Sequence, residues 1–328
     1  KNNMAYTAGN TILDDHYNIF ATGNAAGSGD HNVANINTIW GTGTGGKGYG
    51  QSTVLSSVSA GGNVTATQWT DLFSRLTSIA NHQGTSITAL TNPSAGNTID
   101  AKTTLSANLT SCFNNRRNAA SVGSDITSGG SRTGTATWYT ESLVTYTVTF
   151  SNNEKAEAYF NAGGTIRISS SRSGGTSNNK NTEWTDLCGD IGTVAISGGE
   201  GSAVISSTTY SGTDKIGGGG ATPTINDNYG FHDSTASEIQ IFKQYADTSP
   251  YTANYIRMTM SDNGAGVITI KVKYRDDAAD TTSDYNGAQT HDRVDGSLTT
   301  TMALRQPSTT YISNVWSTPT ISSSITQS

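Results

Sequence analysis

The clearest hydrophobic pattern in the chain has the period of a helix and lies in its first third. Between residues 65 and 80 the apolar positions recur at steps of three and four: Trp69, Leu72, Phe73, Leu76, Ile79 and Ala80. Residues at these steps share one face of an α-helix. Thr65 and Gln68 have the spacing of a capping box, and Gly84 is placed to end the helix. We therefore predict an amphipathic helix between Thr65 and Gly84.

Two weaker helical patterns accompany it. From about residue 100 to 118, Leu105, Leu109, Cys112 and Phe113 fall on one side, and two arginines follow near the negative end of the helix dipole. We expect this apolar face to pack against that of residues 65–80. A shorter candidate covers residues 12–20, where the aligned residues are Ile12, His16, Tyr17 and Phe20.

The period changes beyond residue 135. Residues 128–135, SGGSRTGT, contain no apolar side chain. After them, two segments alternate apolar and polar residues, as half-buried strands do; their apolar members are Val144, Tyr146, Val148, Phe150, and Ile268, Ile270, Val272, Tyr274. Shorter candidate strands centre on Ile166/Ile168, Val194/Ile196, Ile239/Ile241, Ile256/Met258/Met260 and Leu298/Met302/Leu304.

These patterns predict a mainly β protein with a small helical N-terminal part. We expect a helical docking or assembly domain over 1–127, a linker over 128–136 and an antiparallel β-sandwich over 137–328. Many short strands separated by Gly, Ser and Asn turns are typical of jelly-roll-like and of immunoglobulin-like sandwiches. The sequence does not choose between the two.

Composition narrows the class of function. Hydrophobic residues make up 33% and charged residues 13% of the 328 residues, so we expect a thin core that gains burial by assembly with copies of itself. The net charge of −6, without a Lys/Arg run, argues against nucleic-acid binding. We also expect no cofactor. Cys112 and Cys188 stand far apart, which favours two buried free thiols over a disulfide or metal site.

The ends of the chain and its apolar runs say little about export. No apolar stretch approaches the ~20 residues that span a bilayer, so we expect no membrane insertion. The start KNNMAYTAGN has no apolar core of the kind found in secretion signals. Met4 resembles a natural start, which leaves the origin of residues 1–3 open.

Three ordered blocks resemble segments of virion structural proteins from marine T4-like myophages of the cyanophage type, often labelled tail-fibre-like. The first block is GYGQS from Gly48, QWTDL from Gln68 and NHQG from Asn81. The second is YFNAGGTIR from Tyr159, SRSGG from Ser171 and KNTEW from Lys180. The third joins YTANYI from Tyr251 to residues 276–277 and DRVDG from Asp292.

The resemblance implies a component of the phage particle rather than an enzyme. It implies a virion location, contacts with other virion proteins and self-association, with a trimer expected by analogy with fibres. The residues expected to form the structural or interface motif are Tyr49, Gln51, Trp69, His82, Phe160, Asn161, Gly163, Gly164, Arg167 and Trp184. Gly163-Gly164 and Gly174-Gly175 permit tight turns around a strand at residues 166–168, with Phe160 and Trp184 closing the core over it.

Candidate chemistry is sparse. The histidines lack metal-like spacing, and we expect His82 to cap or stabilise a turn. Asp276, Asp277 and Asp280 are weak candidates for Ca²⁺ in an acidic loop without the EF-hand pattern. The glycine run 217–220 lacks the context of a phosphate loop. No pair among the scattered glutamates and no serine elbow points to a hydrolase.

The aromatic residues expected in loops leave two interpretations open. Trp40, Tyr49, Tyr210, Tyr229, Tyr285 and Trp316 can stack on sugars of a host surface glycan or fill subunit contacts, and aromatic enrichment at interfaces favours the second. The main hypothesis is a non-enzymatic, self-associating virion subunit. The alternatives are a receptor-binding module for host cell-surface glycan and an enzyme that degrades that glycan.

Overall fold

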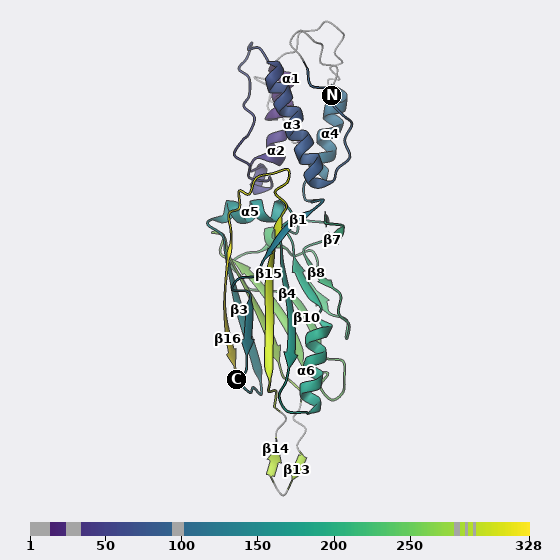
Figure 1. The fold of residues 1–328 in the computed structure, drawn as a ribbon, viewed down its shortest axis with the longest axis vertical. Helices are drawn as coiled ribbons and strands as arrows, with labels where there is room; N and C mark the ends of the chain where they lie inside the picture. The colour runs from purple at the N-terminus through teal and green to yellow at the C-terminus, as the bar shows by residue number, and fades with distance from the viewer. Residues whose placement is uncertain (1–13, 24–33, 94–101, 279–282, 286–287, 291–292) are drawn as a thin grey trace.

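Helices form one end of an elongated molecule, and two β-sheets form its body (Figure 1). The computed structural model describes residues 14–23, 34–93, 102–278, 283–285, 288–290 and 293–328. The helical end contains α1 (Asp14–Ala21), α2 (Ile36–Trp40), the 3₁₀ turn η1 (Thr44–Gly46), α3 (Ala66–Gln83) and α4 (Lys102–Asn114).

Helix α3 confirms the strongest sequence prediction. Both hydrogen bonds of the capping box between Thr65 and Gln68 are present, and Gly84 ends the helix in the left-handed conformation with φ 71°. The apolar face is buried as expected. The weaker predictions correspond to α4 and α1, although Ile12 lies outside the described residues. Tyr17 of α1 packs edge-on against Trp69 of α3, with 5.7 Å between ring centroids.

The first sheet has the strand order β1-β15-β4-β5-β8, and β2 pairs with another part of the long strand β15, along the same edge as β1. All its pairings are antiparallel. The strands are β1 (Val122–Ile126), β2 (Ser131–Gly134), β4 (Thr165–Ser173), β5 (Thr193–Ile196), β8 (Thr213–Ile216) and β15 (Ser297–Pro307).

The second sheet has the order β16-β3-β12-β11-β10-β9 and is also antiparallel. Its strands are β3 (Glu141–Thr149), β9 (Thr224–Ile225), β10 (Ile239–Tyr245), β11 (Tyr255–Asp262), β12 (Val267–Arg275) and β16 (Thr320–Gln327). Two small hairpins stand apart from both sheets: β6 (Ala203–Ile205) with β7 (Thr208–Tyr210), and β13 (Ser283–Tyr285) with β14 (Ala288–Thr290).

Buried tyrosines join the inner faces of the two sheets. The hydroxyl of Tyr146 on β3 donates to the carbonyl oxygen of Thr300 on β15 at 2.7 Å. The hydroxyl of Tyr274 on β12 lies 2.6 Å from Oγ1 of the same threonine. Because the apolar residues of β3 and β12 alternate with polar ones, one face of each strand is buried between the sheets.

The expectation of helices followed by antiparallel sheets is confirmed, but a mainly β fold is not. The chain is about 32% strand and 25% helix. Two helices that the sequence analysis assigned to the β domain account for part of the difference: α5 (Asn153–Asn161) and α6 (Asn179–Asp190). Each is short and carries few large apolar residues, so its helical period is weak. Asn152 and Asn178 begin them as N-caps.

The segment expected to be a linker has a structural role. Residues 131–134 form β2, and the first sheet already begins at Val122. One continuous cluster of buried hydrophobic residues extends from Tyr17 in the helices to Ile321 in the second sheet. The division into domains stays a prediction, and within the expected linker residues 131–134 form a strand of the first sheet.

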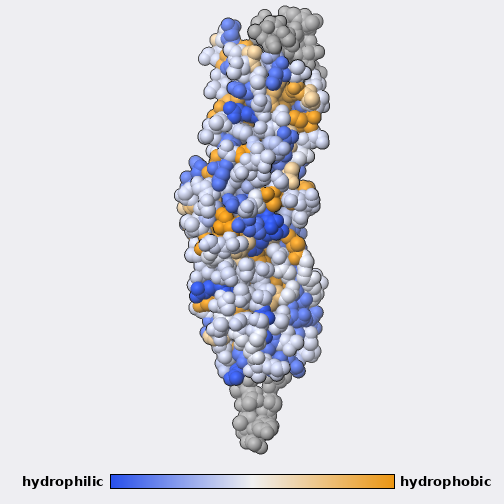
Figure 2. Space-filling view, viewed as in Figure 1, coloured by the Kyte–Doolittle hydropathy of each residue, from blue (hydrophilic) through white to orange (hydrophobic). Residues whose placement is uncertain are grey.

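The remaining bulk features agree with the sequence. Cys112 and Cys188 are buried free thiols, and burial raises the pKa of each to about 12. Among the described residues no helix has the length and apolarity needed to cross a membrane. The visible face in Figure 2 is mostly polar, with apolar residues in small scattered groups.

Candidate functional site

Most of the expected motif residues meet where the helices join the sheets, a region we call the joint. It consists of the loop 47–51, the end of α3, residues 116–120, α5 with the turn after it, and the loops 197–201 and 230–233. These segments are far apart in sequence but lie together in Figure 1. The joint therefore contains the residues best placed to hold the two parts in one orientation.

Tyr49 is the centre of the upper side of the joint. It is fully buried, its hydroxyl donates to the carbonyl oxygen of Arg116 at 3.0 Å, and it accepts from Nε2 of Gln83 at 2.9 Å. Its ring packs edge-on against His82 with 5.0 Å between centroids. Burial raises its pKa well above the ordinary range, so the phenol stays neutral and acts as a structural donor.

His82 connects α3 to the turn after α5. The imidazole is buried, and its Nε2 lies 3.1 Å from the carbonyl oxygen of Ala162. Since a carbonyl oxygen only accepts, Nε2 carries the proton. From the sequence, His82 was expected to cap or stabilise a turn. In the structure it forms a hydrogen bond across the joint and does not cap its own helix. Burial lowers its pKa to about 4.

Gln51 binds a loop that follows the longest strand of the first sheet. Its Nε2 donates to the carbonyl oxygen of Ser313 at 3.0 Å, and its Oε1 accepts from the backbone N of the same residue at 2.9 Å. Ser313 lies between β15 and β16. This pair of bonds fixes the helical end to a connection between the two sheets.

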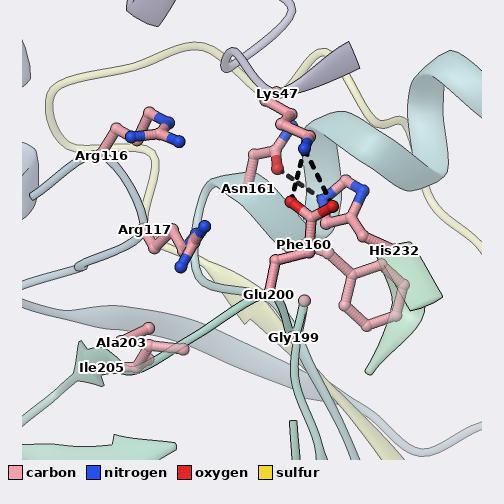
Figure 3. A pocket seen from close by; sticks show the side chains of 11 residues that line it. Lys47, Arg116, Arg117, Phe160, Asn161, Gly199, Glu200, Ala203, Ile205 and His232 are labelled. Carbon is pink, nitrogen blue, oxygen red and sulfur yellow. Dashed lines mark hydrogen bonds and ion pairs between the residues drawn. The ribbon is translucent and has the colours of Figure 1, made fainter. Parts of the chain in front are cut away.

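Asn161 binds both parts at once (Figure 3). Its Nδ2 donates to the carbonyl oxygens of Gly46 and Gly48, at 2.7 and 2.8 Å, and its Oδ1 lies 2.8 Å from Nε2 of His232. Because Oδ1 accepts, this His232 nitrogen is protonated. Burial lowers the pKa of His232. This favours the neutral ring, with its single proton on the nitrogen that donates to Asn161.

A small charged pocket lies beside Asn161, and Figure 3 shows its lining side chains. Lys47 from the helical end pairs with Glu200 from the sheet body at 2.7 Å. Burial opposes ionisation of Glu200, but the hydrogen bond and charge of Lys47 outweigh it and lower the pKa. Glu200 has φ 57°, an uncommon conformation for a side-chain-bearing residue. The cavity is about 20 Å³, room for about one water, so it cannot hold an organic substrate.

Glycines in the quoted motifs permit the close contacts of the joint. A Cβ on Gly48 would lie 2.1 Å from the carbonyl oxygen of Gly41, and one on Gly163, where φ is 93°, would lie 2.6 Å from the Cβ of Ala119. Neither position has room for a side chain. Packing thus explains Gly48 of the first block and Gly163 of the second.

A second polar cluster joins the second and third blocks around the start of α6. Nζ of Lys180 lies 2.9 Å from Oδ2 of Asp276, and both side chains are at most 1% exposed. Arg172 donates to the carbonyl oxygens of Asn181 and Asp295. Asp295 accepts from the Thr176 hydroxyl at 2.6 Å, and this bond is the main reason why its pKa falls to about 2.

The remaining expected motif residues pack within the joint, as Phe160 does, or outside it. Trp69 belongs to the helical core. Phe160 stacks on Phe231 with 4.5 Å between centroids, and Trp184 packs edge-on against Trp138 at 4.9 Å. Arg167 reaches the hydroxyl of Tyr210 at 3.4 Å. Gly174 and Gly175 adopt positive φ as expected, and a Cβ on Gly164 would overlap the ring of Tyr159.

Two of the three expected calcium ligands form ion pairs with basic side chains. Asp276 is paired with Lys180, Asp277 pairs with Arg275 at 2.7 Å, and Asp280 lies outside the described residues. Among the described residues a different group, Glu183, Asp186 and Asp247, has carboxylate oxygens within 4.8 Å of one another. Two of its members, Glu183 and Asp186, line a groove of about 670 Å³ between α6 and residues 248–251. Its oxygens suit a hard divalent cation.

Burial changes the interpretation of the loop aromatics. Trp40, Tyr49, Tyr210 and Trp316 are buried inside the chain, so their rings are available neither to a sugar nor to a neighbouring subunit. Tyr229 is half-buried, and the side chain of Tyr285 lies outside the description. The exposed large rings are instead Tyr139, Tyr245 and Tyr311.

Asn161→Ala tests the joint. Removing the amide leaves two backbone carbonyls and one histidine nitrogen without this partner, and we expect a loss of about 1–3 kcal/mol in the free energy of unfolding, measured by urea denaturation. The matched control is Asn63→Ala. Asn63 is exposed in the loop before α3, its side chain makes no hydrogen bond within the described part of the chain, and its replacement should change stability by less than about 0.5 kcal/mol. Equal effects of the two variants would contradict the role given to Asn161.

Several joint residues carried no sequence signal. Lys47 and His232 stand in unremarkable contexts, whereas Glu200 is flanked by glycines in GGEG, a pattern that indicates a constrained turn. No protein-family model, curated protein or solved structure matches the chain. The function proposed below therefore rests on the geometry of the chain and on the resemblance of its three sequence blocks.

Proposed function

We propose that the chain is a non-enzymatic structural component of a bacteriophage virion, a tail-fibre-like or appendage subunit that self-associates and contacts other virion proteins. The observation that carries the proposal is the joint. Its buried hydrogen bonds fix the helical end to the sheet body in one elongated unit. Such a unit suits a structural part of a particle better than an enzyme.

Two further features support this proposal. The segments that resemble virion proteins supply the residues of the joint and of the cluster around α6, so the resemblance coincides with the parts that hold the fold. The finer fold belongs to the same proposal. With tyrosines bridging the inner faces, the two sheets form an antiparallel sandwich of jelly-roll-like or immunoglobulin-like kind.

Self-association would use the polar side of the second sheet's end strand. Ser322 and Ser324 of β16 are exposed, and their neighbours on β3 are Thr147 and Thr145. Light scattering after size exclusion should give a multiple of the 34.2 kDa chain mass, three by analogy with fibres. A stable monomer at micromolar concentration would contradict self-association.

Lysines introduced on the exposed side of β16 test the contact surface. Ser322→Lys with Ser324→Lys should shift the assembly to monomer, because lysines on an exposed end strand oppose its pairing with another chain. The matched control is Ser56→Lys with Ser57→Lys, in an exposed loop of the helical end, which should leave the mass unchanged. Labelling of intact particles with an antibody to the chain tests the virion location independently.

A second candidate function is recognition of host cell-surface glycan. One observation favours it: Tyr245, 42% exposed, lies next to Tyr255 on the outer face of the second sheet with 5.5 Å between ring centroids. Paired, accessible tyrosines on a sheet face suit a sugar ring better than a particle contact.

A further inference from the structure

A row of positive charges crosses the outer face of the second sheet. The strand register places Lys243 of β10 opposite Arg257 of β11, and Arg257 opposite Lys273 of β12. Neighbouring strands are ~4.8 Å apart, so the three side chains stand in line on one face. The chain as a whole has a net charge of −6, which makes this row opposite in sign to the rest of the protein.

The row is unfavourable for folding. Like charges directly opposite each other on neighbouring strands destabilise a sheet. Lys273 is compensated by Glu141 at 2.7 Å, but within the described part of the chain neither Lys243 nor Arg257 makes an ion pair. Nε of Arg257 is buried and has no hydrogen-bond partner there. An arrangement that breaks a local rule of stability points to a binding role.

The surrounding residues indicate the chemistry of the ligand. Nζ of Lys243 lies 3.8 Å from the ring centroid of Tyr255 and 4.2 Å from that of Tyr245. An anionic group bound by the ammonium would therefore sit beside aromatic rings. That combination fits a sugar that carries a carboxylate, since its ring contacts the tyrosine and its charge contacts the cation.

The rest of the face argues for a polysaccharide over a protein. Protein interfaces need large, buried aromatic or apolar anchors at their centre. Here several outward positions farther along the face carry hydroxyl groups, which suit sugar hydroxyls: Thr145, Thr147, Ser261 and Thr269. Cations on three successive strands match an extended polymer with repeating negative charge.

We propose that the outer face of β10, β11 and β12 binds an acidic polysaccharide, with Lys243, Arg257 and Lys273 contacting its carboxylates and Tyr245 a sugar ring. This inference rests on the second candidate function, glycan recognition. It names both the ligand class and the surface.

The experiment compares one polymer in two charge states. The full chain is titrated into polygalacturonate and into the same polymer after reduction of its carboxyl groups. We expect binding to the acidic form, weakening with added salt, and at least about tenfold weaker binding to the reduced form.

Variants then locate the surface. Arg257→Gln and Tyr245→Ala should each weaken binding about tenfold, whereas Lys155→Gln on α5, outside this face, should leave it unchanged. Arg257→Gln should not lower the melting temperature, because it removes a like charge from the row. Retained folding separates loss of the ligand from loss of the structure.

Other results would overturn the inference in distinguishable ways. Equal binding to both polymers would keep glycan recognition but reject recognition of charge, and no binding to either would reject both. Binding that Arg257→Gln leaves intact would place the ligand elsewhere. If Arg257→Gln instead abolished self-association, without any polysaccharide binding, the partner of this face would be another copy of the chain.

Discussion

Replacing Lys180 by methionine is expected to lower the free energy of unfolding by about 3–5 kcal/mol. The ammonium and the Asp276 carboxylate lie 2.9 Å apart at about zero exposure, and the neutral side chain would remove the positive charge that faces this buried carboxylate. Desolvation of the carboxylate then opposes folding without the compensation that the Lys180 ammonium supplies. Urea denaturation of both proteins, with coincident fluorescence and circular dichroism transitions, measures the difference.

Two controls separate burial from charge. Lys271→Met removes an ion pair with Glu238 whose side chains are 39% and 41% exposed, and it should cost at most about 1 kcal/mol. Lys180→Met combined with Asp276→Leu should recover much of the loss, because two well-packed apolar residues replace a buried pair at little cost. If Lys180→Met costs no more than Lys271→Met, the buried pair is not a main stabilising contact.

The elements that the sequence predicted correctly are those whose determinants lie within one short segment. Helix α3 has its apolar face, its capping box and its terminal glycine within one stretch, so short-range physics determines it. The strands β3 and β12 alternate over their whole length. In each case one face of the element packs on the core and the other faces solvent. The spacing of the apolar residues therefore indicates which face is buried.

The missed elements have their determinants elsewhere in the chain. Strand β1 carries only two large aliphatic residues and is held by pairing with the far end of β15. Helix α6 has few apolar residues, and polar side chains are among those that it buries. Its Trp184 packs against Trp138, which lies outside the helix. A residue pattern cannot report such partners, because tertiary contacts override local preference.

The motif residues were found without their roles. Tyr49, His82 and Asn161 stood out in the sequence, but the joint that unites them depends on bonds between residues far apart, such as Gln51 with Ser313. The row of positive charges on the outer face could not be predicted from the sequence either. Lys243, Arg257 and Lys273 align only through the register of three strands, which a single sequence does not specify.

The joint should also make stability depend on pH through His82. Burial lowers the pKa of this histidine to about 4 from an ordinary value of 6.5. The unfolded chain therefore binds a proton between these pH values that the folded chain does not bind, and stability increases with pH over this window. The contribution is complete above pH 6.5 and is lost progressively as the pH falls to about 4, by about 3 kcal/mol in total.

Comparison with His82→Gln isolates this contribution. Glutamine keeps a donor for the carbonyl oxygen of Ala162 but does not titrate, and His232 is common to both proteins, so its own effect cancels. Paired carboxylates such as Asp125 and Asp295 have lowered pKa values and act at lower pH. Urea denaturation at pH 7 and at pH 4.5 should show a clearly larger loss for the wild type than for the variant. Equal losses would mean that the His82 imidazole becomes protonated without opening the joint, and that its bond to Ala162 does not hold the helices to the sheets.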